Sequence, residues 1–329
     1  MNWTGKRVLV TGAGGFIGSH LTERLVELGA SVRALVHYNS LGSWGWLDTS
    51  PLKSQIEVVS GDIADRGSVQ HAMQDREIVF HLAALIAIPY SYIAPISYVN
   101  ANIIGTLNVL ENARQMGTER VLHTSTSEVY GTALEVPISE KHPLQGQSPY
   151  SASKIGADKL AESYFRSFET PVVTVRPFNT FGPRQSARAV MPTIISQALS
   201  QDRIKLGSLT PTRDLNFVSN TVDGFIKAAE APKEKALGAT VNLGSNREIS
   251  IGDLAKAIIE IVGRPVEIVT DDQRLRPAKS EVERLLADNR LAKELIDWEP
   301  KVRFEDGLKT TIEWMKSNLG RYRADVYNV

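Results

Sequence analysis

A short apolar run followed by a glycine-rich turn constrains this chain more than any other feature. Residues 7–11, Arg-Val-Leu-Val-Thr, predict a β-strand, and the amphipathic pattern of residues 16–28 predicts a helix. Between them lies a G-x-x-G-x-x-G sequence. Gly12 suits a tight turn, Gly15 lets backbone N–H groups approach a pyrophosphate, and Gly18 allows close packing of helix on strand. This order predicts the first unit of a nucleotide-binding βαβ fold.

The alternation of strand-like and helical patterns continues through the first half of the chain. Further apolar, β-branched runs predict strands at 31–36, 56–59, 78–84, 120–124 and 172–176. Helical patterns stand between them, the longest at 95–116 and 150–168. Alternating strands and helices predict an α/β fold with a doubly wound, parallel, Rossmann-like sheet. Ligands of such a sheet bind beyond the carboxyl ends of its strands.

After Pro177 the alternation weakens, which predicts a second region. Helical patterns recur at 190–199, 219–231, 250–262 and 288–295, among turn-rich segments. We expect a smaller C-terminal α/β lobe that covers the sheet and contacts the substrate. The predicted dinucleotide-binding domain comprises residues 1–176 with about 212–242, and the predicted substrate-binding lobe comprises 177–211 and 243–329.

Composition narrows the classes of protein to which this chain can belong. Its 37 basic and 37 acidic residues give zero net charge, which offers no support for a nucleic-acid-binding or anionic-membrane surface. The absence of cysteine excludes disulfides and thiol nucleophiles and fits a reducing cytoplasm. The N-terminus lacks the apolar core of a signal peptide, and prolines and asparagines interrupt the uncharged stretch 78–110. We therefore expect a soluble, cytoplasmic protein without a membrane span.

Two residues four positions apart, Tyr150 and Lys154, are candidates for catalysis. In a helix they lie on one face, one turn apart. A free phenol has a pKa near 10, and we expect the Lys154 ammonium to lower it by favouring the phenolate. Such a pair takes a proton from a sugar hydroxyl while a nicotinamide takes the hydride from the same carbon. An isolated Y-x-x-x-K is more often a surface pair, but this one is accompanied by residues just beyond predicted strand ends: Gly12, Asp62, Ala83, Thr126 and Asn179.

The region after the second strand bears on the choice of cofactor. It contains no carboxylate to hold the adenosine ribose, and Arg33, His37, Asn39 and Ser40 tolerate a 2′-phosphate better than an acid does. This favours NADP over NAD slightly. Asp62 is placed either to meet the adenine amino group or to cap a helix. We expect residues 43–47 to form a loop that packs on itself or over the cofactor.

Histidines give no sign of a metal. There are six, without the tight His/carboxylate spacing of a metal site, so we expect no bound metal. His81 and His123 stand within strand-like runs, where hydrogen-bonded core histidines are expected rather than ligands.

Together these residues resemble the extended short-chain dehydrogenase/reductases that act on nucleotide sugars, over essentially the whole chain. The resemblance implies catalytic roles for Thr126, Glu128, Tyr150 and Lys154. It implies cofactor contacts from Gly12, Gly15, Phe16, Ile17, Gly18, His37, Asn39, Ser40, Asp62, Ile63, Leu82, Ala83, Ala84, Asn102, Thr124, Tyr150, Lys154 and Pro177. It implies nucleotide-sugar contacts from Ser127, Asn179, Arg184, Arg188, Val190, Arg213 and Arg276. It also implies a homodimer formed through the helices near 95–116 and 150–168.

Within that family, the Thr126-Ser127-Glu128 sequence looks like the active-site loop of nucleotide-sugar 4,6-dehydratases. The dTDP-glucose enzymes carry Asp-Glu where this chain has Ser127-Glu128, whereas the GDP-mannose enzymes carry Ser-Glu. UDP-glucuronate decarboxylases also carry Thr-Ser-Glu, so the loop alone does not decide the reaction. Residues 182–192 and 276–281 look like those of dehydratases for nucleotide-linked N-acetylglucosamine, from legionaminic-acid-type pathways.

The expected reaction is an internal redox dehydration of UDP- or GDP-N-acetylglucosamine by a tightly bound, regenerated NAD(P)+. Tyr150, with Lys154 and Thr126, removes the C4 hydroxyl proton as the C4 hydride leaves, and Glu128 removes the C5 proton made acidic by the new ketone. Water leaves from C6, and the hydride returns there to give a 4-keto-6-deoxy sugar. The alternatives are a C4 epimerase, which needs no C5 base, a UDP-glucuronate decarboxylase, and a cofactor-binding scaffold without chemistry.

Overall fold

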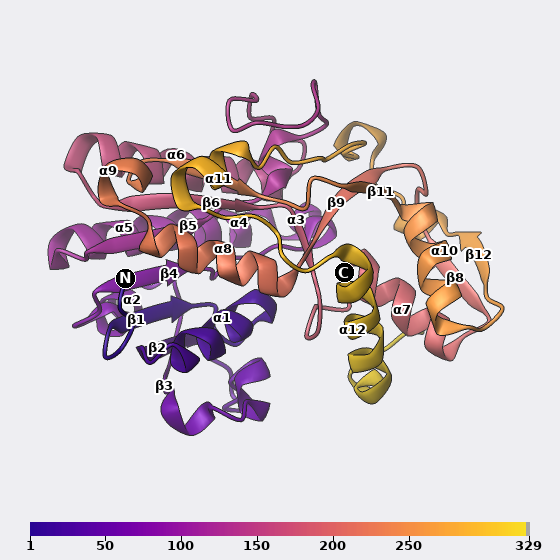
Figure 1. Cartoon of the computed structure of the whole chain (residues 1–329), viewed down its shortest axis with the longest axis horizontal. Helices are drawn as coiled ribbons and strands as arrows, with labels where there is room; N and C mark the ends of the chain where they lie inside the picture. The colour runs from indigo at the N-terminus through magenta and orange to yellow at the C-terminus, as the bar shows by residue number, and fades with distance from the viewer. Residues whose placement is uncertain (327–329) are drawn as a thin grey trace.

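A seven-stranded parallel sheet forms the larger part of the molecule (Figure 1), in the order β10-β6-β5-β4-β1-β2-β3. The computed structural model describes residues 1–326. The strands are β1 (Arg7–Thr11), β2 (Ser31–His37), β3 (Glu57–Gly61), β4 (Ile78–His81), β5 (Arg120–Thr124), β6 (Val172–Pro177) and β10 (Thr240–Leu243). The predicted doubly wound, Rossmann-like sheet is confirmed, and the runs predicted as strands are strands.

Helices cover both faces of this sheet because its strands are apolar on both faces. In β1, Val8 and Val10 pack into one hydrophobic core, and Leu9 packs into another on the opposite face. The first core is closed by α1 (Phe16–Glu27), α8 (Val218–Glu230) and α11 (Arg290–Ile296). The second is closed by α2 (Arg66–Met73), α5 (Gly105–Met116) and α6 (Pro149–Phe168). Strands buried on both faces are typical of parallel sheets.

The strand order reverses between β1 and β4, and in open α/β sheets the ligand-binding crevice lies at such a reversal, beyond the carboxyl ends of the strands. The glycine turn after β1 lies directly against the chain that follows β4. Gly12 has φ +70°, and a Cβ atom added to it would lie 2.8 Å from the backbone nitrogen of Ala83. Glycine is therefore required there both for its backbone conformation and for the close approach.

A helical stretch on the α5–α6 side contains a π-turn. It consists of α3 (Ile88–Ile93), α4 (Pro95–Tyr98), the π-turn Val99–Ile104 and α5. The helix predicted at 95–116 is present, but the π-turn was not expected. Asn102 lies in this turn, buried, and bonds to Leu85 and to Ser153 of α6. π-turns occur often at functional sites, and this one directs a polar side chain toward the base of the crevice.

The remaining elements form a smaller lobe, at the right of Figure 1. A three-stranded sheet has the order β11-β9-β7, and a two-stranded sheet pairs β12 with β8. The strands are β7 (Asn179–Phe181), β8 (Arg203–Leu206), β9 (Thr212–Phe217), β11 (Glu248–Ser250) and β12 (Glu267–Thr270). The helices are α7 (Val190–Ser200), α10 (Ile251–Val262) and α12 (Phe304–Ser317), with the short α9 (Lys233–Ala236) beside the large sheet.

The predicted division of the chain requires two corrections. β9 pairs with β7 and β11, so the return to the large sheet begins at Val218 rather than at about 212. α11 was assigned to the lobe, but Ala292 and Ile296 pack into the core of the large sheet because they meet the apolar face of α8. The chain thus passes repeatedly between the two parts.

The loop after β2 joins the two parts of the molecule. Its 3₁₀ turn (Gly45–Thr49) carries Trp46, whose ring centroid lies 5.5 Å from that of Trp314 on α12. The Arg321 guanidinium lies 4.9 Å from the Trp46 ring centroid. Part of the C-terminal tail, to which the sequence assigned no role, therefore packs on the N-terminal half; its last residues, 327–329, lie outside the described part of the chain. Within residues 1–326, no helix is both long and apolar enough to cross a membrane.

Candidate active site

The N-terminus of α6 brings Tyr150 and Lys154 together in the crevice. Ser148 caps the helix: its hydroxyl accepts from the Ser151 N–H at 3.1 Å, and the Ser151 hydroxyl accepts from the Ser148 N–H at 2.9 Å. This reciprocal cap fixes where the helix begins. Tyr150 and Lys154 are both buried, one turn apart on a helix that packs against the π-turn and β6.

Lys154 is held by the strand beside it. Its ammonium donates a hydrogen bond of 2.6 Å to the backbone carbonyl of Thr124, the last residue of β5. Burial lowers the pKa of Lys154 to about 8, and the carboxylate of Asp158, one turn further along α6, acts in the opposite direction. The charge of Lys154 therefore depends on its buried surroundings.

The expected lowering of the Tyr150 pKa by Lys154 is wrong for this structure. Burial raises the pKa of the Tyr150 phenol above its ordinary value. A hydrogen bond with Thr126 lowers it, and the nearby charges of Glu128 and Asp158 raise it further. Desolvation penalises the phenolate more than one hydroxyl partner favours it. In this structure the surroundings of Tyr150 therefore favour the protonated phenol.

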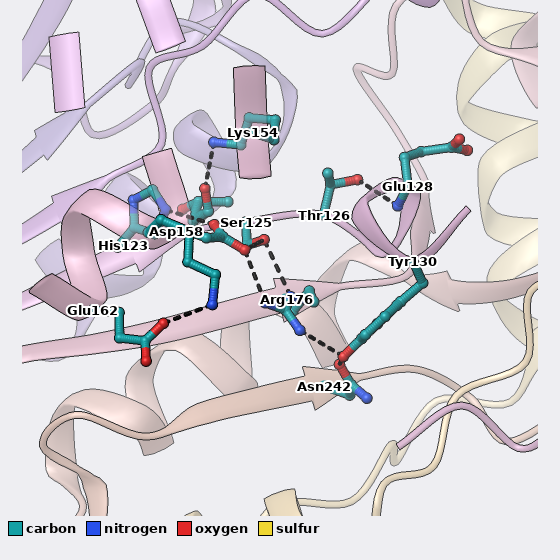
Figure 2. Close-up of polar contacts among 12 residues, drawn as sticks. His123, Ser125, Thr126, Glu128, Tyr130, Lys154, Asp158, Glu162, Arg176 and Asn242 are labelled. Atoms are coloured by element: carbon teal, nitrogen blue, oxygen red, sulfur yellow. Dashed lines mark hydrogen bonds and ion pairs between the residues drawn. The ribbon is translucent and has the colours of Figure 1, made fainter. Parts of the chain in front are cut away.

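Glu128 reaches the same crevice from a short 3₁₀ turn (Ser127–Tyr130) that follows β5. Thr126 caps this turn, with its hydroxyl accepting from the Glu128 N–H at 3.2 Å (Figure 2). Ser127 and Glu128 are buried, and the Glu128 charge acts on the Tyr150 phenol. The turn therefore places Thr126 and Glu128 close to the Tyr150 phenol, with Ser127 between them in the chain.

The crevice also has the features of a dinucleotide site. Thr11, at the end of β1, accepts through its hydroxyl from the Ala83 N–H at 3.1 Å, which joins the glycine turn to residues 82–84. The Thr124 hydroxyl and the Asn179 side-chain oxygen are buried and have no hydrogen-bond partner among the described residues. Thr124 ends β5 and Asn179 follows β6, so both unsatisfied atoms lie just beyond strands of the large sheet, where a ligand can complete their hydrogen bonds. Phe16 and Ile17 begin α1, Pro177 ends β6, and Ile63 is buried near α5, so these predicted contacts all border the sheet.

Replacing Gly18 by alanine should weaken cofactor retention, because the new Cβ would collide with the Gly12 carbonyl oxygen. The collision forces the glycine turn away from α1, whose N-terminal N–H groups are those predicted to bind the pyrophosphate. We expect at least a tenfold loss of bound nucleotide after denaturation and chromatography, since 1.4 kcal/mol of lost binding is tenfold. Gly67→Ala on α2, where the added Cβ makes only ordinary contacts, is the control. Equal retention by both variants would contradict this placement of the pyrophosphate.

Two of the four residues expected near the adenosine ribose, Arg33 and Asn39, make hydrogen bonds to other parts of the protein. Arg33 points away, since its guanidinium donates to the carbonyl groups at the end of α2 and pairs with Glu57. Asn39 bonds within its own loop, to the backbone of His37 and Ser43. His37 is exposed at the end of β2, and Ser40 lies in the loop that follows. The support for a 2′-phosphate is therefore reduced to these two residues.

The loop over the glycine turn and the Asp62 side chain are now placed. The Trp46 N–H donates to the Gly14 carbonyl at 3.0 Å, and Asp48 accepts from Ser43 and Trp44, so the loop packs both on itself and against the glycine turn. Asp62 is exposed beyond β3 and accepts from the Ala64 N–H at 2.9 Å. The cap of α2 is Asp65, not Asp62. Asp62 thus remains available for the predicted adenine contact.

Of the four arginines predicted to bind substrate, two converge. Arg213 of β9 and Arg276 lie 3.2 and 3.5 Å from the same carboxylate, Glu281. Arg188 is exposed and close enough to the Tyr98 hydroxyl to influence its pKa. Arg184 does not join them, because its guanidinium is held at 2.9 Å by Glu23 of α1. Val190 is the first residue of α7.

A buried charged cluster behind Lys154 was not predicted. It consists of His123, Asp158 and Arg176, with Ser125 and Tyr130 (Figure 2). A signal for it exists in the sequence, since Asp158 follows Lys154 by four residues on a helix face that is otherwise buried. His81 bonds to Thr11 and Thr106, and burial lowers its pKa well below the ordinary value. Within residues 1–326, no group of His, Asp and Glu side chains is arranged to hold a metal ion.

Comparison with known proteins agrees with this geometry. Residues 9–311 match the family described as GDP-mannose 4,6 dehydratase. The chain is 33% identical to a UDP-glucose 4-epimerase from Mycolicibacterium smegmatis, over 94% of this chain and 99% of that protein. It is 31% identical to the human dTDP-D-glucose 4,6-dehydratase, over 97% and 92%. The crystal structure of DesIV, a dTDP-glucose 4,6-dehydratase from Streptomyces venezuelae with NAD bound, superposes with a TM-score of 0.86 at 27% identity, over 96% of this chain and 99% of that one.

Proposed function

Because this chain belongs to the GDP-mannose 4,6 dehydratase family, we propose that it is a nucleotide-sugar 4,6-dehydratase. Its proposed substrate is UDP- or GDP-N-acetylglucosamine, and its product is the 4-keto-6-deoxy sugar. The observation that carries the proposal is the position of Glu128, a carboxylate on the turn capped by Thr126, close enough to the Tyr150 phenol for its charge to act on it. Oxidation at C4 requires only Tyr150, Lys154 and Thr126, whereas loss of water requires a further base.

In the proposed reaction, the chain's own residues move the protons. A nicotinamide held in the crevice would supply a reversible hydride acceptor and a positive charge that favours the Tyr150 phenolate. Tyr150 removes the C4 hydroxyl proton, with Thr126 as its hydrogen-bond partner. Glu128 removes the C5 proton, which the C4 ketone acidifies, and the C6 hydroxyl leaves as water after protonation by Glu128 or a relay, since position 127 is serine rather than aspartate. General acid–base groups of this kind each contribute about 10²–10⁴-fold.

The diphosphate of the substrate is proposed to bind Arg213 and Arg276, with the sugar between the lobe and the large sheet. Guanidinium groups bind phosphate oxygens bidentately, and these two already share a carboxylate, Glu281, whose place an anion can take. Asn179, the first residue of β7, has a buried side-chain oxygen without a partner among the described residues and is the proposed contact to the substrate. Arg188 and Arg184 are proposed to close on the ligand, which for Arg184 requires release from Glu23.

A C4 epimerase is the second candidate, because one relative with 33% identity is named as a UDP-glucose 4-epimerase. An epimerase needs no base at C5, so Glu128 would then have no role in the reaction. A UDP-glucuronate decarboxylase carries the same Thr-Ser-Glu loop, and a scaffold without chemistry would not need the complete set of Thr126, Glu128, Tyr150 and Lys154. The dehydratase accounts for all four residues.

The test is to incubate the purified protein with UDP- and GDP-N-acetylglucosamine, without added cofactor, and to follow the substrate mass. Loss of one water by either substrate supports the dehydratase and identifies the nucleotide. An unchanged mass with a new C4 epimer would establish the epimerase instead. Carbon dioxide released from UDP-glucuronate would establish the decarboxylase.

The cofactor is proposed to be tightly held NAD(P)+, since Trp46 ties the loop over the glycine turn to α12 and Arg321. NADP+ was slightly favoured because no carboxylate follows β2, and His37 and Ser40 still support this choice. The structurally similar DesIV was solved with NAD. Chromatography of the nucleotide released from denatured protein distinguishes NAD+ from NADP+. Release of NADP+ would support the preference for NADP+, and release of NAD+ would contradict it.

The protein is proposed to act in the cytoplasm as a homodimer through the helices near 95–116 and 150–168. Support comes from large apolar side chains exposed along α3, α4 and the π-turn, where Ile93 is 71% and Ile96 is 74% exposed, with Val99 and Ile104 nearby. Exposed apolar patches of this kind mark interfaces.

Ile96→Asp should therefore convert a dimer to a monomer in light scattering, because a charge would be buried without a partner. Leu134→Asp, at a side chain that is 70% exposed on a loop outside these helices, is the matched control. A dimer that survives Ile96→Asp would place the interface elsewhere.

A further inference from the structure

The buried cluster behind Lys154 has no part in the proton transfers proposed above. Asp158 of α6 lies within 2.9 Å of His123 Nε2, and it accepts from the Ser125 hydroxyl at 2.6 Å and from Arg176 Nη2 at 2.8 Å. All these side chains are buried. A buried ion pair gives little net stability because desolvation opposes the Coulombic gain. Its presence here therefore calls for another explanation.

Arg176 connects this cluster to the turn that carries Glu128. Its Nη1 donates to the Tyr130 hydroxyl at 2.7 Å, and its guanidinium lies 4.8 Å from the Tyr130 ring centroid. The Tyr130 hydroxyl in turn donates to Asn242 of β10 at 2.8 Å. Tyr130 is the last residue of the 3₁₀ turn in which Glu128 is the second. Figure 2 shows Arg176 between Asp158 and Tyr130, so one side chain of β6 is bonded both to α6 and to this turn.

Glu128 itself depends on the backbone of its turn for position. Within residues 1–326, the Glu128 carboxylate accepts no hydrogen bond, and the residue is held through its backbone: its N–H donates to the Thr126 hydroxyl, and its carbonyl accepts from the Gly131 N–H. The Glu128 carboxylate is therefore located by whatever fixes the turn. Catalytic groups must be held within about 0.5 Å of their productive geometry. A misplacement of about 1 Å costs about 10²-fold in rate.

We propose that Arg176 and Tyr130 are positioning residues that set the distance between Glu128 and the Tyr150–Lys154 pair. They allow the base at C5 and the base at C4 to act on one bound sugar in a single orientation. This inference rests on the proposed dehydratase function. It adds that the Arg176–Asp158 salt bridge and the Tyr130 hydroxyl, behind the crevice, keep the groups of the two half-reactions in register.

The test is Tyr130→Phe, which keeps the ring in place and removes only the hydroxyl that joins Arg176 and Asn242. We expect the kcat for loss of water to fall about tenfold, part of the roughly 10²-fold cost of a full misplacement. KM and single-turnover C4 oxidation, read from the absorbance of the reduced nicotinamide, should remain within about twofold. Tyr164→Phe is the matched control and should change neither step. Tyr164 lies on α6, away from the crevice, and its hydroxyl bonds to Glu111 of α5. Arg176→Lys, which keeps the charge beside Asp158 without the two-sided fork, should reproduce the selective defect.

A merely structural role would lower the melting temperature and slow both half-reactions together, which would overturn the proposal, as would an unchanged ratio of the two steps. Failure of the proposed function looks different, since wild-type protein would then release no water from any substrate. An unaltered ratio in Tyr130→Phe, against an active wild type, would reject the positioning role alone.

Discussion

Tyr150→Phe is expected to lower C4 oxidation and water loss together, by about 10²–10⁴-fold, the range for a general acid–base group. The variant keeps the aromatic ring, whose centroid lies 6.2 Å from that of Tyr98, so the packing of α6 should be preserved. It removes the hydroxyl that bonds to Thr126 and that must accept the C4 proton. Because the ketone at C4 is what acidifies C5–H, the second step cannot proceed without the first.

Single-turnover absorbance of the reduced nicotinamide and substrate mass provide the two readouts for Tyr150→Phe. Tyr164→Phe, on the same helix, is the control for loss of a tyrosine hydroxyl. If Tyr150→Phe oxidises C4 at the wild-type rate, the base must be another group, and Glu128, whose charge already acts on this phenol, would be the next to test.

Glu128→Gln should separate the two steps. The amide is nearly the same size as the carboxylate but cannot accept the C5 proton, so we expect loss of water to fall by about 10²–10⁴-fold. C4 oxidation should continue, because Tyr150, Lys154 and Thr126 are unchanged, and reduced nicotinamide should accumulate on the enzyme. The substitution also removes the Glu128 charge, which raises the pKa of the Tyr150 phenol, so it should favour the phenolate that C4 oxidation needs.

The matched control for Glu128→Gln is Glu135→Gln, an exposed carboxylate in the loop after the same turn. The Glu135→Gln variant should catalyse loss of water from the substrate at the wild-type rate. Full dehydratase activity in Glu128→Gln would remove this residue as the C5 base. If both the wild type and Glu128→Gln remove water from the substrate, Ser127 or a group on the substrate would be the next candidate for the C5 base.

The elements of the large sheet were predictable because their signals are local. β1 and β5 have the bounds that their apolar runs indicated, and α6 starts at the Ser148 cap and Pro149. α12 was missed although Phe304, Leu308, Ile312 and Met315 are spaced as in an amphipathic helix. The π-turn at 99–104 has no comparable local signal, since Asn102 is directed inward by partners on α6 and after β4.

The site was predictable only to the extent that its residues follow strands or share a helix face. Thr126, Tyr150 and Lys154 meet these conditions, and the structure brings them together. The direction of the Tyr150 pKa was predicted wrongly, because burial depends on the tertiary structure around the phenol rather than on the spacing to Lys154. The link from Asp158 through Arg176 to Tyr130 joins residues up to 46 positions apart and needs the assembled sheet.

The repeated passage of the chain between sheet and lobe limits how such an enzyme can change. After β6 the chain enters the lobe, returns as α8 and β10, leaves again for β11, α10 and β12, and returns once more as α11 before α12. A single genetic crossover between relatives therefore cannot exchange the lobe as one continuous segment. Wherever the crossover falls, part of the lobe stays with each parent sequence. A new sugar or nucleotide preference has to arise by substitutions within an inherited framework, one contact at a time.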